Sequence, residues 1–375
     1  MNFDSLVETC FAIWQASLTG NDSPTTVTVL GPPGTGKTSA GRELADKMTS
    51  HIRAKVPNAP PAQCVVLDLS SMLPEDLMGL PFRDENVTRY CPQSWLAPLC
   101  EKDAYGVLVL DDLPASSVQV QVACRQGTLE RRFHEMHLAK GVFVMVTGNR
   151  RQDKSAASTL PAHFRNSVVL LPFEPDFKGW ESWYMDQGYD SDVPAFLHFR
   201  KAHFSRLPKD ADDVGAYATP RSWSMLGKLC ASVPEERIGE VASGLVGNGV
   251  STEFQAFRML RRKLVAPEKV LEDPERALPN PGILDSPDKV IAMVTGLGEI
   301  AARKAKGKGT VQVLGKYLRA LSYVSRSNRE YVAVSISTFT AAKGSVKRLV
   351  DAARANRKDP LVRELVNYLA DTLEL

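Results

Sequence analysis

The chain has 375 residues and a formal net charge of +3, with 43% hydrophobic and 24% charged residues. These values are close to the averages of globular proteins and exclude a disordered or fibrous chain. The length exceeds that of an ordinary single domain, so we expect two or three substructures.

Signals for secretion, membrane insertion or zinc binding are missing from the sequence. The N-terminal stretch carries Asp4 and Glu8 among its apolar residues, and no segment approaches about 18 uninterrupted apolar residues. The six cysteines are scattered without a CxxC pair, and HEMH at 134–137 lacks the HExxH spacing of a zinc helix. We therefore expect a cytoplasmic protein without a membrane partner.

The first half of the chain alternates between helical and strand patterns. Residues 3–18 have the periodicity of an amphipathic helix, and the β-branched run 25–30 predicts a buried strand. Residues 74–104 are irregular and proline-rich. Four more apolar runs predict strands at 65–70, 106–112, 142–149 and 167–173. Five such runs separated by helical segments predict an α/β fold with a doubly wound, parallel, five-stranded sheet.

The second half is predicted to be helical. We divide the chain into an α/β core at 1–175, a helical lid at 176–265 and a helical C-terminal region at 266–375, with a proline-rich linker at 265–287. The interval from Arg303 to Lys358 holds fourteen Lys and Arg residues against two acids, a local net charge of +12. This basic segment is either the solvated face of a helical bundle or a surface for an acidic partner.

A phosphate-binding loop follows the first predicted strand. GPPGTGKT at 31–38 matches G-x-x-x-x-G-K-[ST] at every fixed position and precedes a helical pattern. Its backbone N–H groups and the helix N-terminus attract phosphate, while Lys37 reaches the β- and γ-phosphates and Thr38 binds magnesium. The predicted nucleotide-binding residues are Gly31, Pro32, Pro33, Gly34, Thr35, Gly36, Lys37, Thr38 and Ser39.

Two carboxylates end the predicted strand GVLVLDD. Neighbouring parallel strands end at the same edge of a sheet, so Asp111 is predicted to join Thr38 in the Mg²⁺ shell. Asp112 is predicted to orient the water that attacks the γ-phosphate. The alternative for both residues is that they cap the following helix.

These motifs, in this order, resemble those of AAA+ ATPases. LDDLPASSVQVQVACRQGTLERRF, TGNRRQDKSAASTLPAHFRNSVVLLPFEPD, YATPRSW and PEDLMGLPF resemble the MoxR-type branch, which includes NorQ and CbbQ proteins, over roughly residues 25–265. The resemblance implies that Asn149 is sensor 1, a polar group between the γ-phosphate and the attacking water. It implies that Arg221 is sensor 2, a guanidinium that reaches the γ-phosphate from the lid.

The sequence departs from this branch at two positions. Most relatives have glutamate where this chain has Asp112, and the arginine finger that a neighbouring subunit inserts is replaced by Ser167 in the aligned motif. Arg165 is the nearest substitute for the finger. Arg150 and Arg151 remain alternatives.

The resemblance implies a homo-oligomeric ring, most often a hexamer, that uses ATP and Mg²⁺ to remodel a protein client, commonly with a von Willebrand A-domain partner. In a hairpin predicted at 128–141, Arg131 and Arg132 either contact a substrate or a neighbouring subunit, or belong to a solvated hairpin surface. An alternative function is action on nucleic acid through residues 303–358, with Tyr317, Tyr323 and Tyr331 stacking on bases. A slow nucleotide switch is a third alternative. The client, the ring size and the preference for ATP over GTP stay open.

Overall fold

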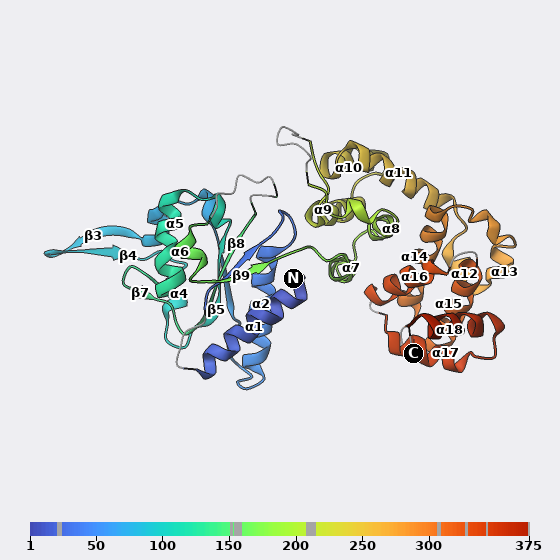
Figure 1. Cartoon of the computed structure of the whole chain (residues 1–375), viewed down its shortest axis with the longest axis horizontal. Coiled ribbons are helices and arrows are strands. Elements are labelled where there is room, and N and C mark those ends of the chain that lie inside the picture. The colour runs from blue at the N-terminus through green and yellow to red at the C-terminus, as the bar shows by residue number, and fades with distance from the viewer. Residues whose placement is uncertain are drawn as a thin grey trace. The chain divides into compact units, whose positions relative to one another are not determined.

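The computed structural model describes residues 1–20, 25–150, 153, 160–207, 215–305, 309–326, 329–342 and 344–373. The chain forms two compact units, Met1–Asp176 and Phe177–Leu375 (Figure 1).

Unit 1 is built on a five-stranded parallel sheet with the strand order β2-β5-β8-β1-β9. The strands are β1 (Val27–Leu30), β2 (Gln63–Asp68), β5 (Tyr105–Asp111), β8 (Gly141–Gly148) and β9 (Val169–Pro172). The glycine-rich loop joins β1 to helix α2 (Lys37–Arg53), as in P-loop NTPases. The predicted fold class is therefore confirmed.

Alternate residues of the strands form two separate cores, one on each face of the sheet. Val107, Val109 and Met145 pack on one face against α2 and α1 (Phe3–Thr19). Leu108, Leu110, Val144 and Val146 pack on the other face with helices α3 (Pro74–Met78), α4 (Ala97–Cys100) and α5 (Val118–Arg125). Strands buried on both faces explain the unbroken apolar runs in the sequence.

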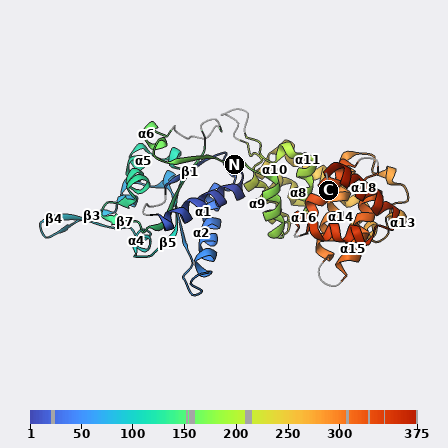
Figure 2. The same cartoon turned by 60° about the horizontal axis from the view of Figure 1, so that its bottom comes forward.

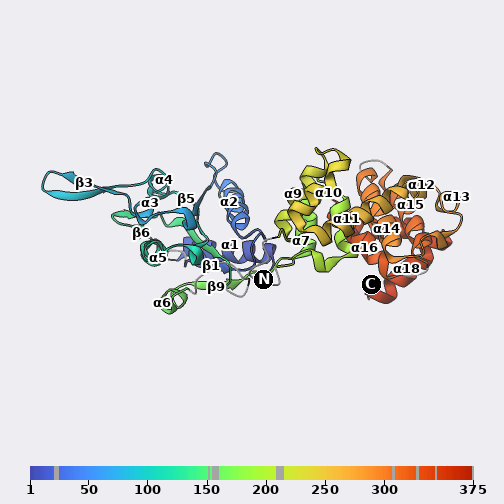
Figure 3. The same ribbon diagram turned by 90° about the horizontal axis from the view of Figure 1, so that it is seen from above.

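Two antiparallel hairpins extend the unit. The hairpin of β6 (Arg132–Phe133) and β7 (Met136–His137) lies inside the predicted 128–141 interval. The hairpin of β3 (Leu80–Asp84) and β4 (Val87–Cys91) corrects the irregular stretch expected at 74–104. It projects from the body of the unit (Figure 3).

The first part of unit 2 has an aromatic core. Phe196, Trp223 and Phe254 are fully buried and contact one another with ring centroids 5.5–5.8 Å apart. The helices around them are α7 (Phe177–Asp186), α8 (Asp192–Phe199), α9 (Pro220–Cys230), α10 (Ile238–Val246) and α11 (Asn248–Lys263).

The second part of unit 2 is a bundle with its own hydrophobic core. Helix α15 contacts both α14 and α18 (Figure 2). The helices are α12 (Pro267–Glu272), α13 (Pro274–Ala277), α14 (Pro287–Lys304), α15 (Thr310–Val324), α16 (Glu330–Ala341), α17 (Val346–Ala355) and α18 (Pro360–Leu373).

The prediction of a linker at 265–287 is wrong. Val270, Leu271 and Leu278 are at most 2% exposed and belong to the core of this bundle, so the segment is an integral part of unit 2. The division into three domains remains a prediction. Among the described residues, no helix is long and apolar enough to cross a membrane.

Candidate functional site

The glycine-rich loop has a backbone shape that depends on its glycines. Gly34 and Gly36 have φ values of +70° and +97°, in the left-handed region that disfavours side chains. A Cβ atom on Gly31 would lie 2.5 Å from the carbonyl oxygen of Phe173 at the end of β9. The loop therefore lies tightly on the sheet and turns directly into the N-terminus of α2, where free N–H groups favour an anion.

Lys37 lies over this loop and is 7% exposed. Its Nζ donates to the carbonyl oxygens of Gly31 and Pro32 at 3.0 and 2.7 Å, and to Asn149 Oδ1 at 2.9 Å. Asn149 follows β8, the strand between β1 and β5 in the sheet. The ammonium group thus links the loop to the polar end of the neighbouring strand.

Thr38 and Asp111 meet at the end of β5. Thr38 Oγ1 donates to Asp111 Oδ2 at 2.8 Å. The second carboxylate oxygen, Oδ1, accepts from the hydroxyl of Thr147 on β8. Each oxygen of Asp111 therefore has a hydroxyl partner from a different element.

Asp112 and Asn149 form the next polar contact along this edge. Asn149 Nδ2 donates to Asp112 Oδ1 at 3.2 Å. Asp112 has φ +54°, a left-handed conformation that aspartate and asparagine tolerate better than other non-glycine residues. We call the five residues Lys37, Thr38, Asp111, Asp112 and Asn149 the phosphate-binding edge.

The donor atoms of this edge fit the triphosphate and the magnesium ion that the sequence implies. Thr38 and Asp111 offer hard oxygen ligands 2.8 Å apart. Hard oxygen atoms are the ligands that Mg²⁺ prefers. Among the described residues, no cluster of three or more His, Cys, Asp or Glu could hold a metal. With two oxygen ligands from Thr38 and Asp111, the edge suits an ion that takes its other ligands from phosphate and water.

The arginines proposed from the sequence lie in different places. Arg150 is paired with two carboxylates of unit 1. Its guanidinium donates to both carboxylate oxygens of Asp153, at 2.9 and 3.0 Å, and also contacts Glu174. These two carboxylates raise the pKa of Arg150, and the hydrogen bond to Asp153 is the largest cause. Arg151 lies outside the described residues.

Arg165 is exposed at the end of α6 (Ala162–Arg165), close in sequence to the exposed Ser167. Arg221 is exposed in the first turn of α9 and belongs to unit 2. Neither residue is part of the phosphate-binding edge of unit 1.

Arg131 does not fit the surface contact expected of it. Its guanidinium turns inward and donates to the carbonyl oxygens of Ala139 and Val142 at 3.0 and 2.5 Å, and burial lowers its pKa to about 10. Arg132 pairs with Glu130 at 2.6 Å and donates to the carbonyl oxygen of His134. Both arginines therefore stabilise the β6–β7 hairpin itself.

The basic C-terminal segment also differs from its sequence-based interpretation. Tyr317 is fully buried and Tyr323 is 7% exposed, so the prediction that these two rings stack on bases is wrong. Their hydroxyls bond Ser335 and the carbonyl oxygen of Leu278. Tyr331 is half-buried against the same core.

Many basic side chains of this segment have acidic partners. Ion pairs join Arg303 to Glu268, Lys304 and Lys316 to Glu272, Arg319 to Glu275 and Asp359, and Arg326 and Arg329 to Glu364. The acids flank the basic segment in sequence, so folding offsets much of the local charge.

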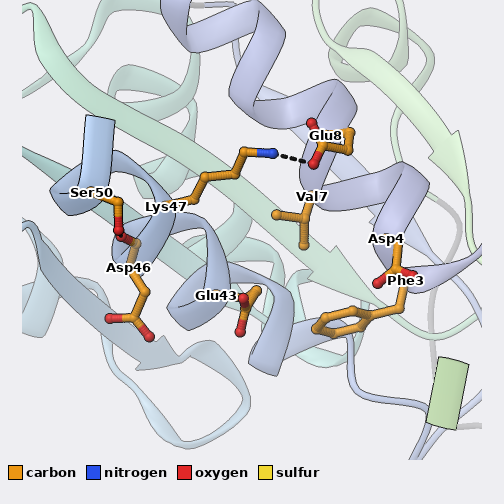
Figure 4. Close-up of a pocket in the computed structure, with 8 residues that line it drawn as sticks. All are labelled: Phe3, Asp4, Val7, Glu8, Glu43, Asp46, Lys47 and Ser50. Atoms are coloured by element: carbon orange, nitrogen blue, oxygen red, sulfur yellow. Dashed lines mark hydrogen bonds and ion pairs between the residues drawn. The ribbon is translucent and has the colours of Figure 1, made fainter. Parts of the chain in front are cut away.

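A pocket of about 390 Å³ lies between α1 and α2 (Figure 4). Asp4, Glu8, Glu43 and Asp46 line it, and Lys47 pairs with Glu8. An excess of carboxylates repels phosphate, so this pocket is not a nucleotide site.

Thr147 is the contact residue that sequence reasoning missed. It precedes Asn149 by two residues, and residues two apart in a strand share a face. That spacing was the available signal, but the partner on β5 depends on the strand register, which a single sequence does not give.

Comparisons with known proteins identify distant structural neighbours only. No family model matches the chain, and no curated protein matches it. Solved structures with similarity include PCH-2 of C. elegans (13% identity, 70% of this chain and 69% of that chain, TM-score 0.38). A second is a single-residue variant of RuvB from Thermotoga maritima (12% identity, 75% of this chain and 84% of that chain, TM-score 0.33). A third is NtrX of Brucella abortus in complex with ATP (11% identity, 74% of this chain and 68% of that chain, TM-score 0.31). All three TM-scores lie below 0.5, and the fold assignment rests on the sheet and its loop.

Proposed function

We propose that the chain is a magnesium-dependent ATP hydrolase of the AAA+ type. The observation that carries the proposal is the phosphate-binding edge, where one loop and two strand ends bring Lys37, Thr38, Asp111, Asp112 and Asn149 into a hydrogen-bonded series. Such a series supplies what phosphoryl transfer needs, namely charge stabilisation and a held water, with little covalent chemistry.

Each member of the series has a distinct task. Residues 31–39 cradle the phosphates, and Lys37 moves its donors from loop carbonyls to phosphate oxygens. Thr38 and Asp111 hold Mg²⁺, which when bound neutralises charge on the β- and γ-phosphates. Asp112 accepts a hydrogen bond from the attacking water, and Asn149 fixes that carboxylate while contacting the γ-phosphate.

A neighbouring subunit completes the site in this proposal. Arg165 is exposed and fits an arginine finger better than Arg150, whose guanidinium already holds Asp153 and Glu174. Arg221 acts as sensor 2 from the helical lid. Sites completed by neighbours imply a closed homo-oligomer, which we expect to be a hexamer.

The energy of hydrolysis remodels a protein client, in the manner of a MoxR-like chaperone with a von Willebrand A-domain partner. The β3–β4 hairpin supports this proposal, because Leu80, Phe82 and Val87 are 48–59% exposed on it. The strand register places these three side chains on one face. Exposed apolar surface on a projecting element is typical of a protein contact.

Steady-state ATP hydrolysis tests the enzyme proposal. Lys37→Ala is expected to lower the rate by about 10²–10³-fold, because the variant has no charge at the transferred phosphate. Lys47→Ala is the matched control: the residue lies on the same helix, pairs with Glu8 and should leave the rate unchanged. Equal rates in wild type and Lys37→Ala would end the enzyme proposal. Lys37-dependent ATP binding without turnover would leave the slow nucleotide switch.

An Asp112→Asn variant, which we expect to bind ATP without hydrolysing it, tests the client proposal. It should retain a client in pull-downs only when ATP is present. Adding Phe82→Ser and Leu80→Ser should release that client without changing nucleotide affinity. Retention that is independent of ATP would contradict the proposal.

A second candidate function, action on nucleic acid, is favoured by helix α17 and the turn after it. Lys347, Arg348, Arg354, Arg357 and Lys358 are exposed there, and the ion pairs found among the described residues do not include them. DNA binding at low salt should weaken in Lys347→Ala/Arg354→Ala/Lys358→Ala, and the salt dependence should become shallower by about 0.9 for each phosphate that is no longer neutralised. Lys316→Ala, which removes a paired charge, is the control. Absence of binding to DNA and RNA at low salt would exclude this function.

A further inference from the structure

We propose that Thr147 is a positioning residue that holds Asp111 in the orientation needed for magnesium binding. This inference rests on the proposed function, because it concerns the same site. It concerns a residue outside the nucleotide-binding motif, on the strand that leads to Asn149.

The contacts of Asp111 carry the argument. Thr147 is fully buried, and its hydroxyl donates to Asp111 Oδ1. Thr38 donates to Oδ2 at 2.8 Å. Because the two hydroxyls occupy different oxygens, the carboxylate cannot rotate about its own axis without breaking one bond.

The position of Thr147 in the sheet explains why a hydroxyl is needed there. Phe143 and Met145 precede it on the same face of β8, and both are fully buried in an apolar core. Thr147 is therefore the point at which this row changes from apolar to polar. A valine would fill the same volume and would keep the β-branched shape that suits a strand, so only the hydrogen bond distinguishes the two residues.

Thr28 on the adjacent strand β1 provides an internal comparison. It is also fully buried, yet its Oγ1 has no hydrogen-bond partner in the described part of the chain. A buried threonine in this sheet thus does not find a partner automatically. The bond from Thr147 to Asp111 is a specific feature of the strand ends that meet the phosphate-binding loop.

The consequence concerns the orientation of the Asp111 carboxylate plane. The two oxygens are chemically equivalent, so the bond from the buried Thr147 to one of them fixes the plane in which the other lies beside Thr38. Without that bond, the carboxylate could turn about its Cβ–Cγ bond and move the oxygen that faces Thr38. Groups that orient a metal ligand in this way typically affect metal affinity by about 10–100-fold.

The test compares Thr147→Val, Thr147→Ser and Thr28→Val in the full chain. A fluorescent ATP analogue is titrated in EDTA and then at increasing MgCl₂. Thr147→Val should raise the half-saturating Mg²⁺ concentration by about tenfold, while affinity in EDTA stays within about twofold. Thr147→Ser keeps the hydroxyl and should restore most of the Mg²⁺ response. Thr28→Val should change neither quantity.

A Mg²⁺ response of Thr147→Val equal to that of wild type would overturn the inference, as would a serine variant that behaves like the valine variant. If Thr147→Val does not fold, the comparison of Thr147→Ser with Thr147→Ala decides by the same criterion. Wild type that binds Mg²⁺–ATP without hydrolysing it would refute the enzyme proposal and leave this inference intact. Wild type that binds no nucleotide would refute both.

Discussion

Two groups of charged side chains in the described part of the chain differ in what the charges contact. The phosphate-binding edge of unit 1 consists of groups that contact a loop and the ends of strands. The second group, which we call the buried charge cluster, lies in unit 2 and consists of Asp190, Asp192, Arg258, Arg261 and Glu299.

The charges of the buried charge cluster pair with one another, although Arg258 Nε and Glu299 Oε1 have no hydrogen-bond partner in the described part of the chain. Arg258 bonds Asp190 at 3.0 Å, and Arg261 bonds Asp192 and Glu299, each at 2.9 Å. Burial raises the pKa of Glu299 and of Asp192, although the arginines oppose that rise. The residues come from α8, α11 and α14 and from the turn before α8, so their bonds join the aromatic part of unit 2 to its C-terminal bundle.

The comparison indicates how a structural charge cluster differs from a candidate site. In the cluster, each charge faces an opposite charge on another element, and a ligand would have to displace a buried ion pair. At the phosphate-binding edge, Lys37 donates to three neutral oxygens, those of Gly31, Pro32 and Asn149, and phosphate oxygens can replace them. These replaceable bonds favour the edge as the site of chemistry.

The largest predicted effect comes from removing one arginine of the buried charge cluster. Arg261→Ala leaves Asp192 and Glu299 buried without this partner, which should cost about 3–5 kcal/mol in the free energy of unfolding of unit 2. Urea denaturation followed by tryptophan fluorescence measures the change, since Trp223 lies in unit 2. Nucleotide affinity in unit 1 should stay within about twofold of wild type.

Arg262→Ala is the matched control for that prediction. Arg262 is the next residue on α11, is 53% exposed at its side chain and pairs with Glu235 at 2.7 Å. An exposed ion pair contributes about 0–1 kcal/mol, so this variant should unfold close to wild type. Similar destabilisation by the two substitutions would contradict the distinction between them.

The second prediction concerns Asp112 and its left-handed backbone. Asp112→Glu lengthens the carboxylate at φ +54°, where a longer side chain bonds less well to its own turn. We expect a decrease of roughly 1 kcal/mol in stability and a 10- to 100-fold lower rate of hydrolysis, because the carboxylate no longer meets Asn149 in the same place. Thermal unfolding and steady-state turnover measure the two effects.

Asp112→Asn separates the effect of the left-handed backbone on stability from the effect of the carboxylate on hydrolysis. Asparagine tolerates the left-handed region and can still bond Asn149, so stability should match that of wild type. Hydrolysis should fall by about 10²–10⁴-fold, because the amide cannot accept a proton from water. A glutamate variant faster than wild type would show that the shorter acid is a defect rather than an adaptation to this turn.

The sequence predicted the sheet well because its signal is local. Each strand is a β-branched or apolar run, and strands buried on both faces need no alternation to be recognised. The β3–β4 hairpin was missed for the opposite reason. Both of its faces are largely exposed, so Leu80, Phe82 and Val87 alternate with Pro81 and Arg83 without an apolar core to explain the pattern.

The expected linker shows how composition can mislead. Pro267, Pro274 and Pro287 each stand at the start of a helix, a position where the missing N–H costs nothing. Three helices in succession that each begin with proline therefore have the proline content of a linker. The meeting of Thr38 with Asp111 was predictable from the common edge of parallel strands, whereas the contact of Thr147 needed the strand register.

The smallest predicted effect is the pH dependence that Glu299 gives to the stability of the buried charge cluster. Burial is the largest cause of the raised pKa of Glu299, and Arg261 opposes it. A carboxyl whose pKa is higher in the folded than in the unfolded chain binds its proton more tightly when folded. The resulting gain in the free energy of unfolding is fully present below pH 4.5, the pKa of Glu299 in the unfolded chain. It is lost as pH rises through the raised pKa of Glu299 in the folded chain.

Glu299→Gln cannot titrate, so the difference in unfolding free energy between wild type and this variant should fall as pH rises from 4.5 through the raised pKa of folded Glu299. Each unit of pKa difference corresponds to about 1.4 kcal/mol. Glu268→Gln, at an exposed ion pair with Arg303, is the control for general effects of charge removal. A difference that grows with pH would mean that attraction by Arg261 outweighs burial. The buried charge cluster would then be an ion pair that favours ionised Glu299, and not a site where burial favours the protonated acid.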